Sequence, residues 1–564
     1  MRTLLKNGSV INVFTGEIEP ANVLIENDRI IGVGDYTDAE ADVIKEVSSK
    51  YICPGFIDGH IHIESTMLLP EELAKVCVPH GTTAIVADPH EIANVCGTDG
   101  ISYMLEASEN LPMDVYVMLP SCVPSTCFDE AGAELEAQDL EPFYAHKRVL
   151  GLAEMMNYPG VLAGDSKIQD KLESALSRGL RVNGHAPLLS GKGLDTYIAA
   201  RISDDHECSS AEEAMERIRK GQRVMIRQGT AARNLNALLP LFEEPWASRC
   251  MLVTDDKHPA DLLAHGHIDA IIRQAVRCGK NPVTGIKMAT LGAAEYFGLQ
   301  WQGAVAPGYV ADILVLDDLN EISVCDVYHK GEMVVENGSL KAFDTPSVDS
   351  ELKEKVCHSF QMDALAAEDF FVDEAPEKQC RVIRLVKGEL LTEEWQTELD
   401  WAKTNGIDVQ RDILKLAVIE RHHHTGHKGI GFINGCGLQC GAIASSVSHD
   451  SHNLIVIGAN ENDMAVAANA IREMGGGSIV VKDGEVIAKM PLPIAGLMTD
   501  LPAEEIAKQN EELRESVHQL GVPKDIEPFM SMAFVSLPVI PHLKMTTNGL
   551  VDVDQFCLVN LVAE

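Results

Sequence analysis

Short apolar runs alternate with longer amphipathic stretches between residues 55 and 300. Parallel strands need a long crossover between them, so this alternation is typical of βαβ units. Eight such units in about 250 residues match the size of a closed barrel. The strand candidates are a run before His60 and residues 83–87, 115–119, 149–153, 181–184, 200–203, 223–226 and 250–254. The pattern therefore predicts an α/β protein with a TIM-type (β/α)8 barrel over residues 55–300.

The segments on either side of this region have a different character. Residues 1–54 contain short strand-like runs separated by turn signals, and they are too few to bury a core alone. Similar runs return in residues 301–345. We expect the two flanks to combine in one small composite β-sandwich domain. Residues 350–564 mix strand and helix patterns, which predicts a separate C-terminal α/β domain.

Composition narrows the range of partners. The chain has 46 Lys and Arg against 85 Asp and Glu, a formal net charge of −39. A surface this acidic repels nucleic-acid backbones and anionic lipid, so we expect no nucleic-acid or membrane partner. The 14 cysteines include no CxxC pair, and no apolar segment has the length of a spanning helix. These features predict a cytoplasmic protein.

Polar residues follow several of the predicted strands, at the end where barrel enzymes carry their catalytic groups. Side chains two residues apart on a strand point to the same side, so His60 and His62 face the same way. Imidazole and carboxylate suit divalent transition metals, and six donors exceed the needs of one tetrahedral ion. We therefore expect two divalent ions (Mn, Fe or Zn) that share a bridging carboxylate. The expected ligands are His60, His62, Glu154, His185, His206 and Asp255.

Several motifs resemble a known family. Residues 54–62, Pro-Gly-Phe-Ile-Asp-Gly-His-Ile-His, are similar to the opening signature of the amidohydrolase superfamily. Residues 289–294 and 303–312 resemble the stretch where the chain of that superfamily leaves the barrel and re-enters the β-domain. Within that superfamily, the chain resembles the bacterial adenine deaminases over nearly its full length. This resemblance implies hydrolysis of adenine to hypoxanthine and ammonia. The segments that carry it are 62–65, 88–95, 183–187, 203–207, 254–256, 429–432 and 448–453.

One position separates this chain from related enzymes. Dihydroorotase- and hydantoinase-like enzymes bridge their metals with a carboxylated lysine at the end of the fourth strand. Here that position is Glu154, and no lysine follows before Lys167. The resemblance thus implies that Glu154 is the bridge, which argues against the alternative of a cyclic amide hydrolase. A non-catalytic scaffold relative is a second alternative, but such relatives usually lose metal ligands.

The resemblance also implies a reaction. A metal-activated hydroxide would attack C6 of adenine, and a proton must reach the amine before ammonia leaves. Asp255, after the eighth strand, is the residue that we expect to move this proton while it binds metal. Protonation of a ring nitrogen needs a further acid. Glu64, Glu91 and Asp256 are candidates that the sequence does not rank.

Other polar residues have weaker signals. His90, after the second strand, could contact metal or the purine, with a structural role as an equal alternative, and Asp256 could contact the purine. Arg227 could line the purine pocket, with the start of a surface helix as an equal alternative. Three adjacent histidines at 422–424 cannot all face one ion on regular backbone, so we interpret them and His427 as a solvated loop. The superfamily resemblance implies a homodimer or a larger homo-oligomer.

Overall fold

The computed structural model describes residues 1–564 except residues 231, 388, 389 and 564. The described residues form two compact units. Unit 1 contains residues 1–88, 105–121 and 140–347, and unit 2 contains residues 89–104, 122–139 and 348–564. Unit 2 thus includes two segments from within the range expected for the barrel. None of the described helices is both long and apolar enough to cross a membrane.

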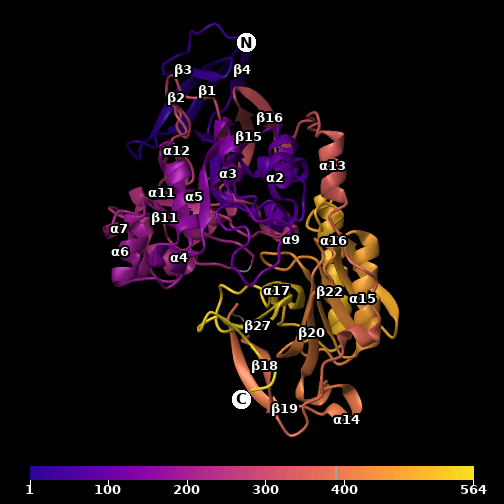
Figure 1. The fold of residues 1–564 in the computed structure, drawn as a ribbon. Helices are drawn as coiled ribbons and strands as arrows, with labels where there is room; N and C mark the ends of the chain where they lie inside the picture. The colour runs from indigo at the N-terminus through magenta and orange to yellow at the C-terminus, as the bar shows by residue number, and fades with distance from the viewer. Residues whose placement is uncertain (231, 388–389, 564) are drawn as a thin grey trace. The chain divides into compact units, whose positions relative to one another are not determined.

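Unit 1 contains the predicted barrel (Figure 1). Five parallel strands form one sheet and three form another, in the orders β6-β7-β8-β9-β10 and β11-β12-β13. A parallel bridge between Ile61 and Asp255 joins the first strand to the eighth, which confirms the closed TIM-like barrel. The strands are β6 (Phe56–Ile61), β7 (Thr82–Ala87), β8 (Asp114–Leu119), β9 (Val149–Met155), β10 (Arg181–Gly184), β11 (Asp204–Asp205), β12 (Arg223–Arg227) and β13 (Cys250–Val253).

The sixth strand differs from the sequence prediction. It covers Asp204–Asp205, whereas the apolar pattern indicated residues 200–203. Ala200 caps the end of the preceding helix, and Arg201 has a left-handed φ of 67°, so the chain is still turning there. A residue in that conformation cannot extend a strand, so the ladder begins only after the turn.

Apolar side chains fill the barrel interior and anchor its helices. Ile57, Met225 and Met251 are buried together below the polar ends of the strands. Helix α10 buries one apolar face, and its N-terminal turn contains Asp269, as the helix dipole favours. The helices of unit 1 are α1 (Pro70–Cys77), α4 (Tyr158–Ala163), α5 (Ser166–Leu176), α6 (Gly191–Ala199), α7 (Ala211–Arg219), α8 (Leu235–Leu238), α9 (Pro259–His265), α10 (Ile268–Arg277), α11 (Pro282–Met288) and α12 (Leu291–Phe297).

The flanks of the barrel pair in one nine-stranded sheet. Its order is β17-β16-β15-β14-β5-β1-β2-β3, and β4 pairs with β1. The two flanks join where β5 and β14 run antiparallel, with Pro54 opposite Ile313. The strands are β1 (Arg2–Ile11), β2 (Ile18–Glu26), β3 (Arg29–Gly34), β4 (Val43–Glu46), β5 (Tyr51–Pro54), β14 (Ile313–Leu316), β15 (Val324–His329), β16 (Glu332–Glu336) and β17 (Ser339–Leu340).

Unit 2 is built on an eight-stranded sheet in the order β19-β18-β21-β20-β23-β22-β24-β25. Helix α15 (Glu461–Met474) begins at Asn460, whose side chain accepts a hydrogen bond from the N–H of Asp463. Its buried face packs on the sheet (Figure 1). The strands are β18 (Gln379–Leu385), β19 (Thr392–Glu398), β20 (Ile413–Ile419), β21 (Lys428–Asn434), β22 (Ala442–Ser445), β23 (Leu454–Gly458), β24 (Gly477–Lys482) and β25 (Glu485–Pro491).

Further elements complete this unit. A small antiparallel sheet follows the order β26-β27-β28, and helix α2 begins the first of the two inserted segments. Their bounds are β26 (Leu543–Thr546), β27 (Gly549–Asp552), β28 (Cys557–Val559), α2 (His90–Ala107), α13 (Ser350–Cys357), α14 (Trp401–Thr404), α16 (Ala503–Gln519) and α17 (Pro528–Ala533).

Candidate metal centre

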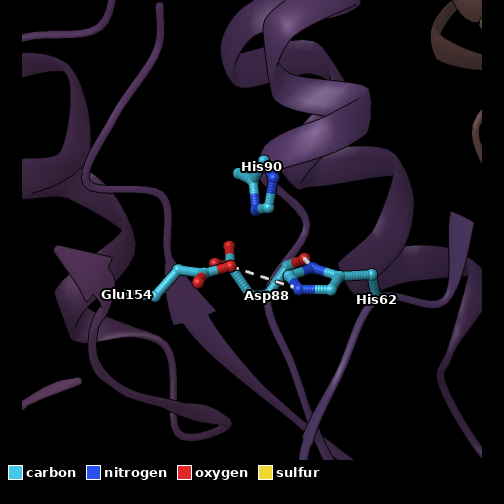
Figure 2. A group of neighbouring side chains, drawn as sticks. All are labelled: His62, Asp88, His90 and Glu154. Atoms are coloured by element: carbon cyan, nitrogen blue, oxygen red, sulfur yellow. Dashed lines mark hydrogen bonds and ion pairs between the residues drawn. The ribbon is translucent and has the colours of Figure 1, made fainter. Parts of the chain in front are cut away.

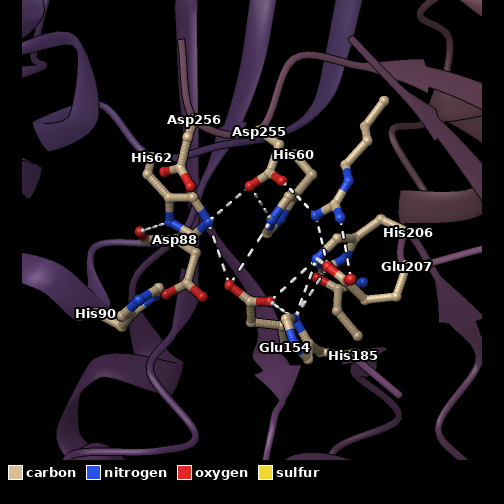
Figure 3. A network of polar contacts seen from close by, with 12 residues as sticks. His60, His62, Asp88, His90, Glu154, His185, His206, Glu207, Asp255 and Asp256 are labelled. Carbon is tan, nitrogen blue, oxygen red and sulfur yellow. Dashed lines mark hydrogen bonds and ion pairs between the residues drawn. The ribbon is translucent and has the colours of Figure 1, made fainter. Parts of the chain in front are cut away.

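Four imidazoles and two carboxylates meet where the barrel strands end, all within unit 1 (Figure 3). Each predicted ligand lies near the C-terminal end of a strand or directly after it. The six side chains therefore meet, because the carboxyl ends of parallel strands lie on one rim of the barrel. His185 is the most exposed, with 20% of its side chain accessible, and the others are buried. The set is His60 on β6, His62 after β6, Glu154 on β9, His185 after β10, His206 after β11 and Asp255 after β13.

Glu154 lies between two pairs of histidines. Its Oε1 is 3.2 Å from Nε2 of His62 and 3.8 Å from Nε2 of His60. Its Oε2 is 2.7 Å from Nδ1 of His185 and 3.1 Å from Nε2 of His206. One carboxylate that directs each oxygen to a different imidazole pair has the arrangement of a ligand shared by two ions.

Asp255 completes one side of the centre. Its Oδ1 is 3.6 Å from Nε2 of His60 and 3.2 Å from Nε2 of His62. The residue has a φ of 60°, and its backbone N–H donates to the carbonyl of His60 at 2.9 Å. Aspartate tolerates this left-handed conformation better than most residues, which fits a sharp turn directly after a strand.

The hydrogen bonds of the imidazoles fit metal binding. Nδ1 of His62 lies 3.1 Å from the carbonyl oxygen of Asp88, to which it donates, and Nε2 faces Glu154 (Figure 2). Metal-bound histidines commonly have this second contact. Nε2 of His60 is buried and has no hydrogen-bond partner in the part of the chain that the structure describes. A buried nitrogen of this kind is rare unless an ion satisfies it.

The carboxylates of the centre are ionised. Burial alone would raise the pKa of Glu154, but the charges of His206 and His185 outweigh it and hold that pKa well below its usual range. Burial acts on Asp255 in the same way, and there the charge of Arg227 dominates and lowers the pKa. Both groups are therefore anionic at neutral pH, as metal ligands must be.

Arg227 joins two carboxylates at the rim. Its Nη1 is 2.7 Å from Oδ2 of Asp255 and 2.5 Å from Oε1 of Glu207. Glu207 in turn lies 3.3 Å from His206 and 3.5 Å from His185. The predicted contact of Arg227 with the purine stays a prediction. Glu207 was not among the predicted site residues, although it directly follows the predicted ligand His206 in the sequence.

The buried carboxylate of Asp58 holds the backbone next to the predicted ligands. Asp58 accepts hydrogen bonds from the backbone N–H groups of His60 and Thr254, at 3.2 and 3.1 Å. It also accepts from the hydroxyl of Thr254 at 2.5 Å and lies 3.1 Å from Nε2 of His267. Asp58 thereby links the first and eighth strands at the closure of the barrel. Sequence reasoning missed this role, although Asp58 belongs to the same motif as His60.

The remaining predicted residues fall in both units. In unit 1, Glu64 is buried in a short 3-10 helix directly after the histidine motif. Asp256 accepts a hydrogen bond from the hydroxyl of Ser65 at 2.5 Å. His90 and Glu91 are the first residues of α2 in unit 2. Their roles in the reaction stay predictions.

Three histidines of the 422–427 stretch contact three separate residues of unit 2. Nε2 of His422 donates to the carbonyl of Ser451 at 2.8 Å. Nε2 of His423 donates to the carbonyl of Ala131 at 2.9 Å, and Nδ1 of His427 is 2.7 Å from a carboxylate oxygen of Glu130. These imidazoles hold loop segments together by separate contacts.

Comparison with known proteins gives the family. The model of the amidohydrolase family matches residues 51–343, and that of the adenine deaminase C-terminal domain matches residues 389–557. The chain is 45% identical over 561 residues to an adenine deaminase of Desulfatibacillum aliphaticivorans, which covers 99% of this chain and 96% of that protein. This chain belongs to the adenine deaminase family. Its likeness to adenine deaminase 2 of Carboxydothermus hydrogenoformans is 46% over 560 residues, with the same coverage.

Among solved structures, this member of the adenine deaminase family is similar to dihydropyrimidinase from Brevibacillus agri NCHU1002. The TM-score is 0.49 at 16% sequence identity, over 60% of this chain and 96% of that one. Proteins of the amidohydrolase family use divalent metal ions, and the buried histidine and carboxylate groups of unit 1 are suitable donors for them.

Proposed function

We propose that this protein is an adenine deaminase, which hydrolyses adenine to hypoxanthine and ammonia at a centre of two divalent ions. The observation that carries the proposal is the position of Glu154, whose two oxygens face two separate histidine pairs. The similarity to adenine deaminases over 99% of the chain supports adenine as the substrate.

The ligands divide into two groups around Glu154. His60, His62 and Asp255 would hold one ion, because their donor atoms lie within 4.8 Å of one another. His185 and His206 would hold the second ion, with Glu154 shared by both. When bound, two divalent ions lower the pKa of a water molecule so that hydroxide is present near neutral pH.

Asp255 is suited to move the proton. It is a buried anion whose Oδ2 is held by Arg227 at 2.7 Å, while Oδ1 faces the histidines. A carboxylate fixed in this way can take a proton from the attacking water and return it to the amine of the substrate. Glu64 and Asp256, both in unit 1, are candidates to protonate a ring nitrogen, and Glu91 is the third.

Metal identity and assembly are part of the same proposal. Imidazole and carboxylate accept Mn, Fe or Zn, so availability decides among these metals. We infer that the protein works in the cytoplasm as a homodimer or a larger homo-oligomer. Light scattering coupled to size-exclusion chromatography measures the assembly directly, and a monomer at micromolar concentration would contradict it.

Metal removal and replacement of Glu154 test the proposed function together. The purified protein should contain about two divalent ions per chain and should release ammonia from adenine. Chelation should abolish this release, and Mn, Fe(II) or Zn should restore it. Glu154→Gln should lower kcat by about 100-fold or more and reduce the metal content, because the shared ligand loses its charge.

The control is Glu173→Gln, on an exposed position of α5, which should leave both quantities unchanged. Substrates with a hydantoin or dihydroorotate ring, followed by ultraviolet absorbance, test the cyclic amide alternative. Ring opening without ammonia release, or full deaminase activity in Glu154→Gln, would refute the proposal.

A further inference from the structure

Two imidazoles and two carboxylates face one another inside unit 2, apart from the candidate metal centre of unit 1. His90 and Glu91 begin helix α2, in the first inserted segment of unit 2. His449 and Asp450 lie in its C-terminal segment, and all four residues are buried. Buried carboxylates need a positive partner, which can be a protonated imidazole or a metal ion. The distances within this cluster decide between the two.

Each facing nitrogen of the cluster lies near both carboxylates. Nδ1 of His449 is 2.9 Å from Oε1 of Glu91, and Nε2 of His90 is 3.4 Å from the same oxygen. Oδ1 of Asp450 is 3.7 Å from Nδ1 of His449 and 3.9 Å from Nε2 of His90. The two contacts of Asp450 are too long for hydrogen bonds. Ligands about 2.1 Å from a tetrahedral ion lie about 3.4 Å apart, so the four distances together fit one shared ion.

His452 contacts the other oxygen of Glu91 and has a different task. Its ring belongs to the same group of possible donors as Glu91 and His449. The backbone N–H of Ser448 donates to Nδ1 of His452 at 3.2 Å, so that nitrogen carries no proton. The proton of the ring is then on Nε2, which donates to Oε2 of Glu91. A nitrogen that carries a proton cannot bind a metal, so His452 orients the carboxylate, as groups around metal ligands commonly do.

The backbone on both sides of the cluster is fixed. The backbone N–H of His449 donates to the carbonyl of Ala533 at 2.9 Å. The ring of Phe534 stacks on that of His449, with centroids 4.4 Å apart and an angle of 20° between the planes. In α2, the side-chain amide of Asn94 donates to the carbonyl of His90 at 3.0 Å. These contacts hold the donor atoms in place for an ion.

We propose that this cluster binds one divalent transition-metal ion, such as Zn, in addition to the two ions of unit 1. Imidazole and carboxylate are donors that such an ion accepts. The ligands would be His90, Glu91, His449 and Asp450. Because they come from segments 89–104 and 348–564, the ion would connect the first inserted segment to the C-terminal part of unit 2. Its task is therefore structural, and Glu91 as a ligand would not serve as an acid of the reaction.

Metal analysis of the zinc-saturated full chain tests the site. After incubation with Zn(II) and dialysis, the protein should hold about three ions, two in unit 1 and one in this cluster. Asp450→Asn removes the charge of one ligand at nearly constant volume and should lower the count by about one. Asp363→Asn is the matched control, because the Asp363 side chain of the same unit is 81% exposed, and it should leave the count unchanged. Equal counts in Asp450→Asn and the unchanged protein would overturn the proposal.

Zinc affinity separates the role of His452 from that of a ligand. Both variants of His452 are made in the Glu154→Gln background, in which the centre of unit 1 is impaired. His452→Gln can place an N–H near the Nε2 position and should keep the affinity within about threefold, whereas His452→Leu should weaken it by about 10- to 100-fold. Competition with a chromophoric chelator gives both values. Equal affinities in the two variants would overturn the positioning role.

Unfolding provides a measurement that does not depend on activity. In the Glu154→Gln background, zinc-loaded protein should have a higher urea midpoint than chelated protein, and Asp450→Asn should remove this difference. An equal effect of zinc with and without Asp450→Asn overturns the site, even in a protein that deaminates adenine. If Asp450→Asn loses one ion and the midpoint shift, while Glu154→Gln keeps full deaminase activity, the proposed function fails and this site stands.

Discussion

Buried charges of this protein usually have a partner of opposite charge beside them. Arg217 is fully buried, with Nε 3.4 Å from Asp205 and Nη1 3.1 Å from Glu213. Arg227 is held in the same way between Glu207 and Asp255. Burying an unpaired charge costs several kcal/mol, so removal of one partner leaves the other strongly destabilising.

Asp129 of unit 2 is an exception. Burial raises its pKa to about 7, and the charge of Asp450 adds to this effect. Hydrogen bonds from the hydroxyls of Ser125 and Thr126, both 3.0 Å long, offset only part of it. The carboxyl group is thus easier to protonate in the folded chain than in the unfolded one.

The stability of the protein should therefore depend on pH through Asp129. An unfolded aspartate has a pKa of about 3.9, so the folded state binds the proton more tightly. The contribution of Asp129 to stability is then largest below pH 4 and falls as the pH rises to about 7, by at most about 1.4 kcal/mol per pH unit. Asp129→Asn cannot ionise, so its gain in free energy of unfolding in urea over the unchanged protein should be larger at pH 8 than at pH 5. The opposite trend would show that Asp129 is stabilised as an anion.

At the scale of elements, β21 shows how closely two sheets of unit 2 approach. Gly429 and Gly431 lie two residues apart on this strand and face β26. A Cβ at Gly429 would lie 1.9 Å from the backbone oxygen of Thr546. A Cβ at Gly431 would lie 2.6 Å from the terminal methyl of Met545, which can rotate away. The same added methyl group thus meets rigid backbone at one position and a flexible side chain at the other.

Alanine substitution should destabilise the protein more at Gly429, which faces backbone, than at Gly431, which faces a flexible side chain. Gly429→Ala should lower the free energy of unfolding by about 3 kcal/mol or more, because overpacking against backbone forces the sheets apart. Gly431→Ala is the matched control on the same face and should cost about 1 kcal/mol or less. Urea unfolding followed by circular dichroism gives both values. Equal losses in the two variants would mean that the backbone contact is not the determinant.

At the scale of the whole molecule, unit 2 contains two segments that the chain inserts between barrel strands. The side chain of Asn453 donates to the carbonyl of Glu130 at 2.7 Å, and that of Asn548 donates to the carbonyl of Phe128 at 3.0 Å. His423 contacts Ala131 in the same inserted segment. Residues 122–139 are therefore an integral part of unit 2 and not a loop that extends freely into solvent.

Deletion of residues 348–564 should for this reason prevent correct folding of the rest. The segments 89–104 and 122–139 would lose their partners and expose buried polar and apolar groups. We expect the fragment 1–347 to be insoluble, and co-expression of 348–564 as a separate chain to restore soluble protein. A soluble fragment 1–347 with its full metal content would contradict this prediction.

Local sequence patterns determined the barrel of this protein and predicted its six candidate metal ligands. Strand and helix periodicities depend on neighbouring residues, and the spacing of His60 and His62 places both on one side of a strand whatever surrounds it. Tertiary structure alone decided which distant groups support them. Asp58 meets Thr254 across 196 residues, and Glu91 meets His452 across 361. No local pattern encodes such pairs, because they form only when the barrel closes and when unit 2 gathers segments from distant parts of the chain.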